Sequence, residues 1–271
     1  MLAKLFRAVT NRSPHLRKTT WRLAYDYLAR VYPQDFWRFM NYGYAPLEGE
    51  ALNVALEAQD EADRYCIQLY HLVANAIDIS GLHVLEVGCG RGGGASYIAR
   101  YLRPATIVGL DFSKAAIAFC RKHHTAPGLS FTEGDAENLP FEDHRFDVVV
   151  NVESSHCYSN IDRFFSEVQR VLKPGGHFLF TDLRGKDEVE ALRNQLKASG
   201  LIAVEESEIT AKVIRALDLD NTRKKNLIEQ IVRGPISKYF RDFAGIKDSG
   251  VYERFRTGHN IYLRFVLRKP A

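Results

Sequence analysis

Residues 86–94 read Glu-Val-Gly-Cys-Gly-Arg-Gly-Gly-Gly and follow a short apolar run at 82–87. Gly88, Gly90 and Gly93 satisfy the pattern G-x-G-x-x-G, and Asp111 lies 23 residues after Gly88. Such glycines allow the backbone to approach a ligand closely, and an acid at the end of the next strand can accept hydrogen bonds from two ribose hydroxyls. The pattern therefore predicts an adenosine-containing ligand at a strand-to-helix turn.

Strands and helices alternate on both sides of this glycine loop. Strands are expected at 82–87, 106–110, 129–133, 147–152, 177–181 and 201–206. Helices are expected at 93–101, from Ser113 with this serine as its cap, at 162–172 and at 188–198, and a turn is expected at 174–176. The strand at 147–152 is apolar throughout, as a strand buried on both faces should be. This β-α-β-α order predicts a parallel sheet with right-handed crossovers.

The chain divides into four regions on its patterning. Residues 1–80 are expected to form a helical N-terminal cap or lid, since 60–77 carry an apolar stripe at helical spacing and nine aromatics fall between Trp21 and Tyr44. Residues 81–206 are expected to form the ligand-binding core. A helical insert at 207–250 would cover the site, and 251–271 would supply the last strand of the core.

Composition excludes several classes of protein. The 271 residues are 46% hydrophobic and 26% charged, which is typical of a globular enzyme. No run of residues is long and apolar enough to span a bilayer, and residues 1–9 lack the features of a signal peptide. Four widely spaced cysteines favour a reducing cytoplasm over a disulfide framework or a zinc site.

The basic charge is concentrated at the N-terminus. Residues 1–30 hold seven Lys and Arg and one acid, so the remaining 241 residues sum to −2 in a chain of net charge +4. The main domain therefore lacks the charge expected of a nucleic-acid-binding protein. A solvated helix face is the favoured explanation for the basic residues, and contact with a membrane surface or an acidic partner stays open, as does an oligomer.

Further motifs distinguish between nicotinamide and S-adenosylmethionine as the adenosine-containing cofactor. Glu86 precedes the first glycine by two residues, residues 134–137 place acids after the third strand, and Leu-Lys-Pro-Gly-Gly stands at 172–176. In this order and spacing the series resembles the class I S-adenosylmethionine-dependent methyltransferases. That resemblance implies an α/β, Rossmann-like fold with a mostly parallel seven-stranded sheet, an N-terminal helical cap and a helical insert before the last strand.

A narrower resemblance extends over most of residues 36–185. The motifs at 39–44, 69–71, 92–97, 134–140 and 151–158 are similar to those of the phthiotriol/phenolphthiotriol dimycocerosate methyltransferases, which are O-methyltransferases of bacterial polyketide lipids. The wider group contains small-molecule methyltransferases of natural-product pathways. This resemblance implies a hydrophobic small-molecule acceptor such as a polyketide, a lipid or another secondary metabolite.

The resemblance also implies a cofactor site at the carboxyl edge of the sheet. Around the methionine part and the ribose, its implied members are Glu86, Gly88, Cys89, Gly90, Asn151, Val152 and Tyr44. Around the ribose hydroxyls and the adenine they are Asp111, Phe112, Asp135, Ala136 and Glu137. Arg91 stands where related enzymes commonly have a small or hydroxyl residue. Its side chain could pair with the cofactor carboxylate or face solvent, and both alternatives stay open.

His156 is the candidate general base, because it follows the fourth strand at the edge where ligands bind and imidazole titrates near neutrality. Related enzymes carry a histidine at the matching place and an acid after the fifth strand, which here is Asp182. A carboxylate orients imidazole and stabilises its protonated form. The sequence thus favours metal-independent O-methylation.

Two alternatives stay open at this stage. The chain could methylate carbon or nitrogen of a prenylated or alkaloid-like natural product, with aromatic side chains stabilising a cation. It could also bind the cofactor without any acceptor, as a partner subunit. Loss of O-methylation in a His156→Ala variant would separate the first alternative from O-methylation.

Overall fold

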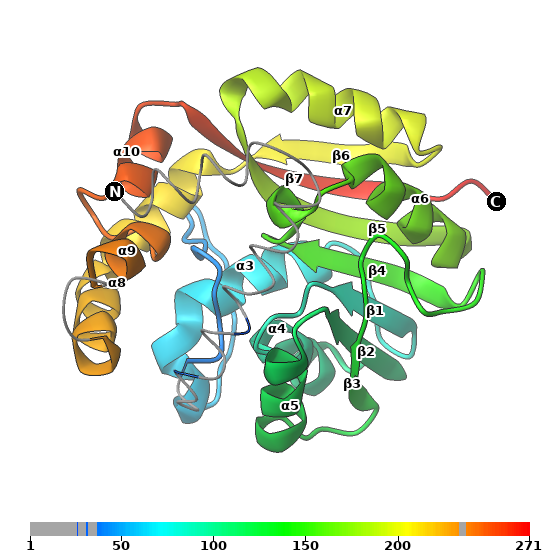
Figure 1. The fold of residues 1–271 in the computed structure, drawn as a ribbon, viewed down its shortest axis with the longest axis horizontal. Coiled ribbons are helices and arrows are strands. Elements are labelled where there is room, and N and C mark those ends of the chain that lie inside the picture. Colours follow the sequence, from blue (N-terminus) through cyan, green and yellow to red (C-terminus); the bar gives the residue numbers. More distant parts are fainter. Residues whose placement is uncertain (1–25, 27–30, 32–36, 233–236) are drawn as a thin grey trace.

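The computed structural model describes residues 37–232 and 237–271, together with Asp26 and Val31. Its centre is a seven-stranded sheet with the order β3-β2-β1-β4-β5-β7-β6 (Figure 1). The strands are β1 (His83–Val87), β2 (Thr106–Asp111), β3 (Leu129–Glu133), β4 (Phe146–Val152), β5 (Leu172–Gly185), β6 (Ile202–Glu208) and β7 (Asn260–Arg268).

Strand direction matches the predicted architecture. The pairs β1–β2, β1–β4, β2–β3 and β4–β5 are parallel, whereas β7 is antiparallel to both β5 and β6. The strand order reverses direction at β1, whose neighbours β2 and β4 lead to opposite edges of the sheet. Ligands bind at such a switch point, beyond the carboxyl ends of the strands. The mostly parallel Rossmann-like prediction is confirmed.

Two apolar layers cover the sheet, and β4 shows why. Val148 and Val150 face one layer, while Phe146 and Val149 face the other, and all four side chains are almost fully buried. Alternate side chains of a strand point to opposite faces, so an uninterrupted apolar strand needs cover on both. Removing this apolar surface from water stabilises the sheet at roughly 25 cal/mol per Å².

Helices provide that cover (Figure 1). One face packs against α6 (Ile161–Val171) and α7 (Val189–Ala198). The other packs against helices that precede β3 in the chain and against the insert that precedes β7. The remaining helical elements are η1 (Ala58–Asp63), α3 (Arg64–Ala74), α4 (Gly93–Tyr97), η2 (Ile98–Leu102), α5 (Lys114–His123), η3 (Ser155–Cys157), η4 (Lys186–Glu188), α8 (Thr210–Ile231), α9 (Ser237–Phe243) and α10 (Gly250–Arg256).

Residues 37–45 run as an extended segment between α3 and α8 (Figure 1). The backbone N–H of Tyr44 donates to Tyr65 O at 2.9 Å, and that of Ala45 donates to Lys212 O at 3.1 Å. We call residues 37–42 the strap, because they lie over the site described below. The strap ties the N-terminal part of the chain to the insert.

Three sequence expectations differ from the structure. The cap was expected to be helical over 1–80, but residues 37–57 contain no helix or strand; the rest of the aromatic stretch from Trp21 lies largely outside the described residues. The aromatic side chains of this segment pack individually, Phe39 on Tyr70 of α3, Trp37 on Phe240 of α9 and Tyr42 on Phe255 of α10, so they need no helical period. The final strand was expected from 251, but α10 occupies 250–256, because Ser249 Oγ accepts a hydrogen bond from Tyr252 N and caps a helix.

The third difference concerns the turn expected at 174–176. These residues lie inside β5, at a place where the register with β4 shifts after Phe146. Other boundaries agree closely with the sequence, and Ser113 caps α5 as predicted by accepting a hydrogen bond from Ala116 N at 3.2 Å.

Candidate active site

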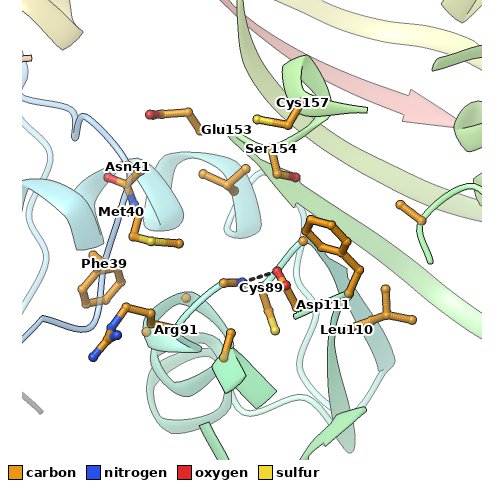
Figure 2. A pocket seen from close by; sticks show the side chains of 18 of the residues that line it. Phe39, Met40, Asn41, Cys89, Arg91, Leu110, Asp111, Glu153, Ser154 and Cys157 are labelled. Atoms are coloured by element: carbon orange, nitrogen blue, oxygen red, sulfur yellow. Dashed lines mark hydrogen bonds between the residues drawn. The ribbon is translucent and has the colours of Figure 1, made fainter. Parts of the chain in front are cut away.

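A large cavity opens at the carboxyl edge of β1, β2 and β4 (Figure 2). It measures about 1290 Å³ including its open mouth. The loops after these strands supply one side of its wall, and the strap supplies the other.

The glycine loop is closely packed as well as tightly turned. Gly88 has φ +76°, and a Cβ there would lie 2.3 Å from Ser154 Oγ. Gly94 lies in α4 with no positive φ, yet a Cβ on it would lie 2.0 Å from the ring of Tyr70. The close approach of α3 to α4 therefore requires glycine at position 94.

Two buried carboxyls flank the glycine loop. Asp111 lines the cavity and accepts hydrogen bonds from Gly90 N and Ser113 N, both at 2.9 Å (Figure 2). Burial raises the pKa of Asp111 to about 6. Glu86 is fully buried and accepts a hydrogen bond from Tyr70 OH at 2.7 Å, and burial raises the pKa of Glu86 to about 7.

Of the residues predicted around adenine, Phe112, Asp135 and Ala136 line the cavity. Glu137 also borders it, but its carboxylate accepts hydrogen bonds from Ser159 N at 2.8 Å and Ser159 Oγ at 2.7 Å. That carboxylate therefore secures the loop before α6. Asp135 instead holds the turn in which it lies, by accepting from Glu137 N at 3.0 Å.

Besides the glycines and the acids, four residues were predicted around the methionine part. The structure places two of them in the cavity lining and two outside it. Val152 and Cys89 line the cavity. Asn151 is fully buried behind the wall, where its Nδ2 donates to Val87 O and to Ser154 Oγ, both at 2.8 Å. Tyr44 differs from expectation: it lies in the apolar core, outside the lining of this cavity.

His156 and Asp182 come together as predicted from the sequence. His156 lies in η3 and lines the cavity, and its Nδ1 lies 2.8 Å from Oδ1 of the fully buried Asp182. Burial works against the imidazolium, but the charges of Cys157 and Asp182 raise the pKa of His156 well above its usual value.

Asp182 is held by more than the histidine. It accepts hydrogen bonds from Ser155 Oγ and from the backbone N–H of His156, and Arg184 lies 3.2 Å away. Burial alone would raise the pKa of Asp182, but His156 and Arg184 hold it well below its usual range. The carboxylate is thus ionised and fixed in orientation.

Sequence reasoning missed Glu153 as a wall residue. It adopts a left-handed conformation with φ +51°, which is uncommon for a residue with a side chain and often occurs at functional sites. Its Oε2 accepts hydrogen bonds from Tyr42 N at 2.9 Å and Tyr262 OH at 2.7 Å. Burial raises the pKa of Glu153 to about 7. No turn signal in the sequence marks this conformation.

Arg91 does not face solvent, which was one of the two positions left open for it. It is buried, its guanidinium stacks 3.8 Å from the centre of the Phe119 ring, and its Nε donates to Trp37 O. Burial lowers the pKa of Arg91 to about 10. Arg91 therefore links the glycine loop to the strap. His124 is buried too, and its Nε2 lies 2.8 Å from Arg91 O.

The strap forms part of the cavity wall, in the region where the sequence predicted a cap or lid, although it is not helical. Phe39, Met40 and Asn41 face the cavity from the side opposite Asp111 (Figure 2). The methyl group of Met40 lies so near the loop that a Cβ on Gly90 would be 2.6 Å from it.

The residues present fit S-adenosylmethionine. A side chain at Gly88 or Gly90 would collide with the opposite wall, so the loop presents only its backbone. Glu86 Oε2 and Asn151 Oδ1, beside that loop, are buried and have no hydrogen-bond partner among the described residues. Neither residue lines the cavity, so the fit to the cofactor depends on the glycine backbone and on Asp111. Among the residues that the structure describes, no cluster of His, Cys, Asp and Glu could hold a metal ion.

Comparison with known proteins agrees with this geometry. Residues 85–180 match the family model described as "Methyltransferase domain". The chain is 40% identical over 252 residues to a phthiotriol/phenolphthiotriol dimycocerosates methyltransferase of Mycobacterium tuberculosis, covering 93% of both chains. It is 39% identical over 250 residues to a fatty-acid O-methyltransferase of Mycolicibacterium smegmatis, covering 92% of this chain and 90% of the other.

Solved structures share the fold at lower identity. The [4+2]-cyclase SpnF superposes with a TM-score of 0.70 at 22% identity, covering 93% of this chain and 96% of that one. The cyclopropane synthase MmaA2 from Mycobacterium tuberculosis gives 0.67 at 17% identity, covering 89% and 93%.

Proposed function

We propose that this chain, which belongs to the class I S-adenosylmethionine-dependent methyltransferases, transfers a methyl group to a hydroxyl of a hydrophobic small molecule. The acceptor would be a polyketide, a lipid or another secondary metabolite. The names of the relatives support this acceptor class, because one acts on dimycocerosates and another is an O-methyltransferase of fatty acids. Methylation of carbon or nitrogen is not favoured by these names.

The family supports S-adenosylmethionine as the methyl donor, and we propose how this chain would hold it. Gly88 and Gly90 would lie under the methionine part and ribose, and Asp111 would accept the ribose hydroxyls. Phe112 and Asp135 would flank the adenine. When bound, the cofactor supplies an activated sulfonium methyl, so the protein mainly aligns the acceptor and excludes water. Such alignment lowers a barrier by about 7–11 kcal/mol.

The observation that carries the hydroxyl assignment is the pairing of His156 with Asp182 on the cavity wall. In its neutral form His156 would accept the acceptor's hydroxyl proton as oxygen attacks the methyl group. Asp182 would orient the ring and stabilise the imidazolium that forms. A base in hydrogen-bond reach contributes about 10²–10⁴-fold to rate.

We further propose that the strap and the α8–α9 insert act as the lid over the acceptor. Phe39, Met40 and Phe243 border the cavity from these two segments, which supports an apolar enclosure. Among the described residues, no helix has the length and apolar character needed to cross a membrane. The four cysteines are free, which supports a reducing, cytoplasmic location.

The test begins with calorimetric titration of the full chain with S-adenosylhomocysteine, using NAD as the control. Micromolar binding of the first and none of the second is expected. Transfer of labelled methyl from S-adenosylmethionine to long-chain alcohols and phenols is then measured, with long-chain amines as the comparison. Methylation of amines alone would refute the hydroxyl assignment, and binding of NAD alone would refute the donor.

A further inference from the structure

A second cavity lies behind the strap, between residues 37–42 and the helices α8 and α9. It measures about 660 Å³ including its mouth. Most of its wall is apolar, with side chains such as Leu227, Ile228 and Phe240. Residues 37 and 39–42 and Phe243 line both cavities, so the strap is the partition between them.

One buried oxygen atom of the strap accepts no hydrogen bond from the described residues. Asn41 is 7% exposed, and its Nδ2 donates weakly to Cys66 O at 3.4 Å. Its Oδ1 is buried and accepts no hydrogen bond within the described part of the chain. A buried carbonyl oxygen without a donor is rare in folded proteins, so a missing donor is indicated here.

A buried ammonium lines the same cavity. Lys224 in α8 is 8% exposed, and its Nζ donates to Tyr42 O at 3.2 Å. Of its three protons this contact uses one. Among residues 37–232 and 237–271, no carboxylate forms an ion pair with Lys224, because the neighbouring Arg223 holds both Asp220 and Asp63.

The local charges balance without a ligand. Among the described residues, Asp63 and Asp220 offset Arg223 and Lys224, so these four side chains together carry no net charge that would demand an anion. It offers an acceptor atom on Asn41 and spare protons on Lys224. A hydroxyl group can both donate a hydrogen bond and accept one, which matches this pair.

We propose that the second cavity binds the remote part of the methyl acceptor and recognises a second, neutral hydroxyl through Asn41 Oδ1 and Lys224 Nζ. This inference rests on the proposed function. It narrows the acceptor class to elongated apolar molecules that carry two separated oxygen functions. One oxygen lies in the first cavity near His156, and the other lies beyond the strap.

The experiment compares the full-length enzyme on 1-alkanols and on α,ω-alkanediols of matched chain length, scored as kcat/KM for single methylation. We expect a preference for the diol of about 10- to 100-fold at a defined chain length, the range typical of a hydrogen bond to a charged group. The chain length of the preferred diol reports the distance between the site near His156 and the site at Asn41 and Lys224. An ω-hydroxy fatty acid of the same length forms the third arm.

Lys224→Met keeps the volume of the stem and removes the ammonium, and Asn41→Leu removes the carbonyl. Each is expected to bring the diol-to-alkanol ratio close to one. The control is Lys225→Met, which changes the adjacent lysine outside the cavity lining and should preserve the ratio. Because the readout is a ratio on one protein, a general loss of activity or of stability does not imitate the effect.

The outcomes separate this inference from the proposed function. Methylation of alkanols without any preference for diols overturns the second hydroxyl site and leaves the function standing. Preference for the ω-hydroxy fatty acid over the diol also overturns it, because the site then selects an anion. If S-adenosylhomocysteine binds but no alcohol of any kind is methylated, the proposed function fails and the inference fails with it.

Discussion

The His156–Asp182 pair predicts how activity responds to pH and to Asp182→Asn. His156 can accept a proton only when neutral, and its pKa is raised by Cys157 and Asp182 against the effect of burial. Activity should therefore rise with pH as the imidazolium loses its proton, and the midpoint of this rise should lie above the usual pKa of histidine. Removing the carboxylate lowers the pKa of His156, so the limb should move to lower pH in the variant.

The geometry sets the size of the effect. At the 2.8 Å separation of Nδ1 and Oδ1, two unit charges attract by about 6 kcal/mol at an effective dielectric constant of about 20. Arg184 and the His156 backbone share the same carboxylate, so only part of this attraction acts on the imidazolium. His156→Ala should lower kcat by about 10²–10⁴-fold. Asp182→Asn should lower the plateau rate by less, because the base itself remains.

The assay is the pH profile of kcat/KM for labelled methyl transfer to an alcohol, from about pH 5 to pH 9. His259→Gln, on an exposed histidine outside the cavity, is the matched control. Thermal unfolding and S-adenosylhomocysteine binding show whether Asp182→Asn is folded, since breaking a buried ion pair costs about 3–5 kcal/mol. A limb that stays in place in folded Asp182→Asn, or wild-type rates in His156→Ala, would refute the reasoning.

Three further predictions concern the cofactor side of the cavity. Asp111→Ala should weaken S-adenosylhomocysteine binding by about 10- to 100-fold in calorimetry, because hydrogen bonds to a charged group are lost; an unchanged Kd would remove Asp111 from the site. Gly94→Ala should lower the free energy of unfolding in urea by about 1–3 kcal/mol, since its Cβ would lie 2.0 Å from the Tyr70 ring; equal stability would contradict the close packing of α3 and α4. Glu86→Gln should stabilise the cofactor-free protein at high pH, because burial raises the pKa of Glu86 from 4.5 to about 7. As pH rises, Glu86 ionises in the unfolded state before it ionises in the folded state. The loss of folding free energy caused by Glu86 is therefore absent below about pH 4.5, grows as pH rises and reaches about 3 kcal/mol above pH 7. If urea unfolding at pH 4 and pH 8 shows the same stability difference between wild type and Glu86→Gln, this prediction is wrong.

Much of the core could be predicted because its signals are local. The apolar run in β4, the cap at Ser113 and the glycine loop each depend on a few neighbouring residues and a fixed period. The pairing of His156 with Asp182 could also be predicted, since the ends of adjacent parallel strands meet at one edge.

The remaining features depend on contacts between distant parts of the chain. Arg91 and His124 are buried because the strap and α5 close over the glycine loop. Arg91 is 54 residues from its partner Trp37 in the sequence, and His124 is 33 residues from its partner Arg91. The left-handed backbone of Glu153 is maintained by Tyr42 and Tyr262, more than a hundred residues away. No period or turn motif carries such information, so these individual contacts were visible only in the structure.

The position of the insert between β6 and β7 has a consequence for how this protein can change over evolution. These strands are antiparallel neighbours, with Glu208 opposite Leu263, so the insert is topologically the connection of a β-hairpin. Lengthening a closed connection is inexpensive, about 0.6 kcal/mol for each doubling. The segment that contributes Lys224 can therefore be exchanged or resized while the glycine loop and Asp111, which are at least three strands away from β7, keep their geometry. On the proposed function, the part of the chain that chooses the acceptor can therefore change independently of the part that binds the methyl donor.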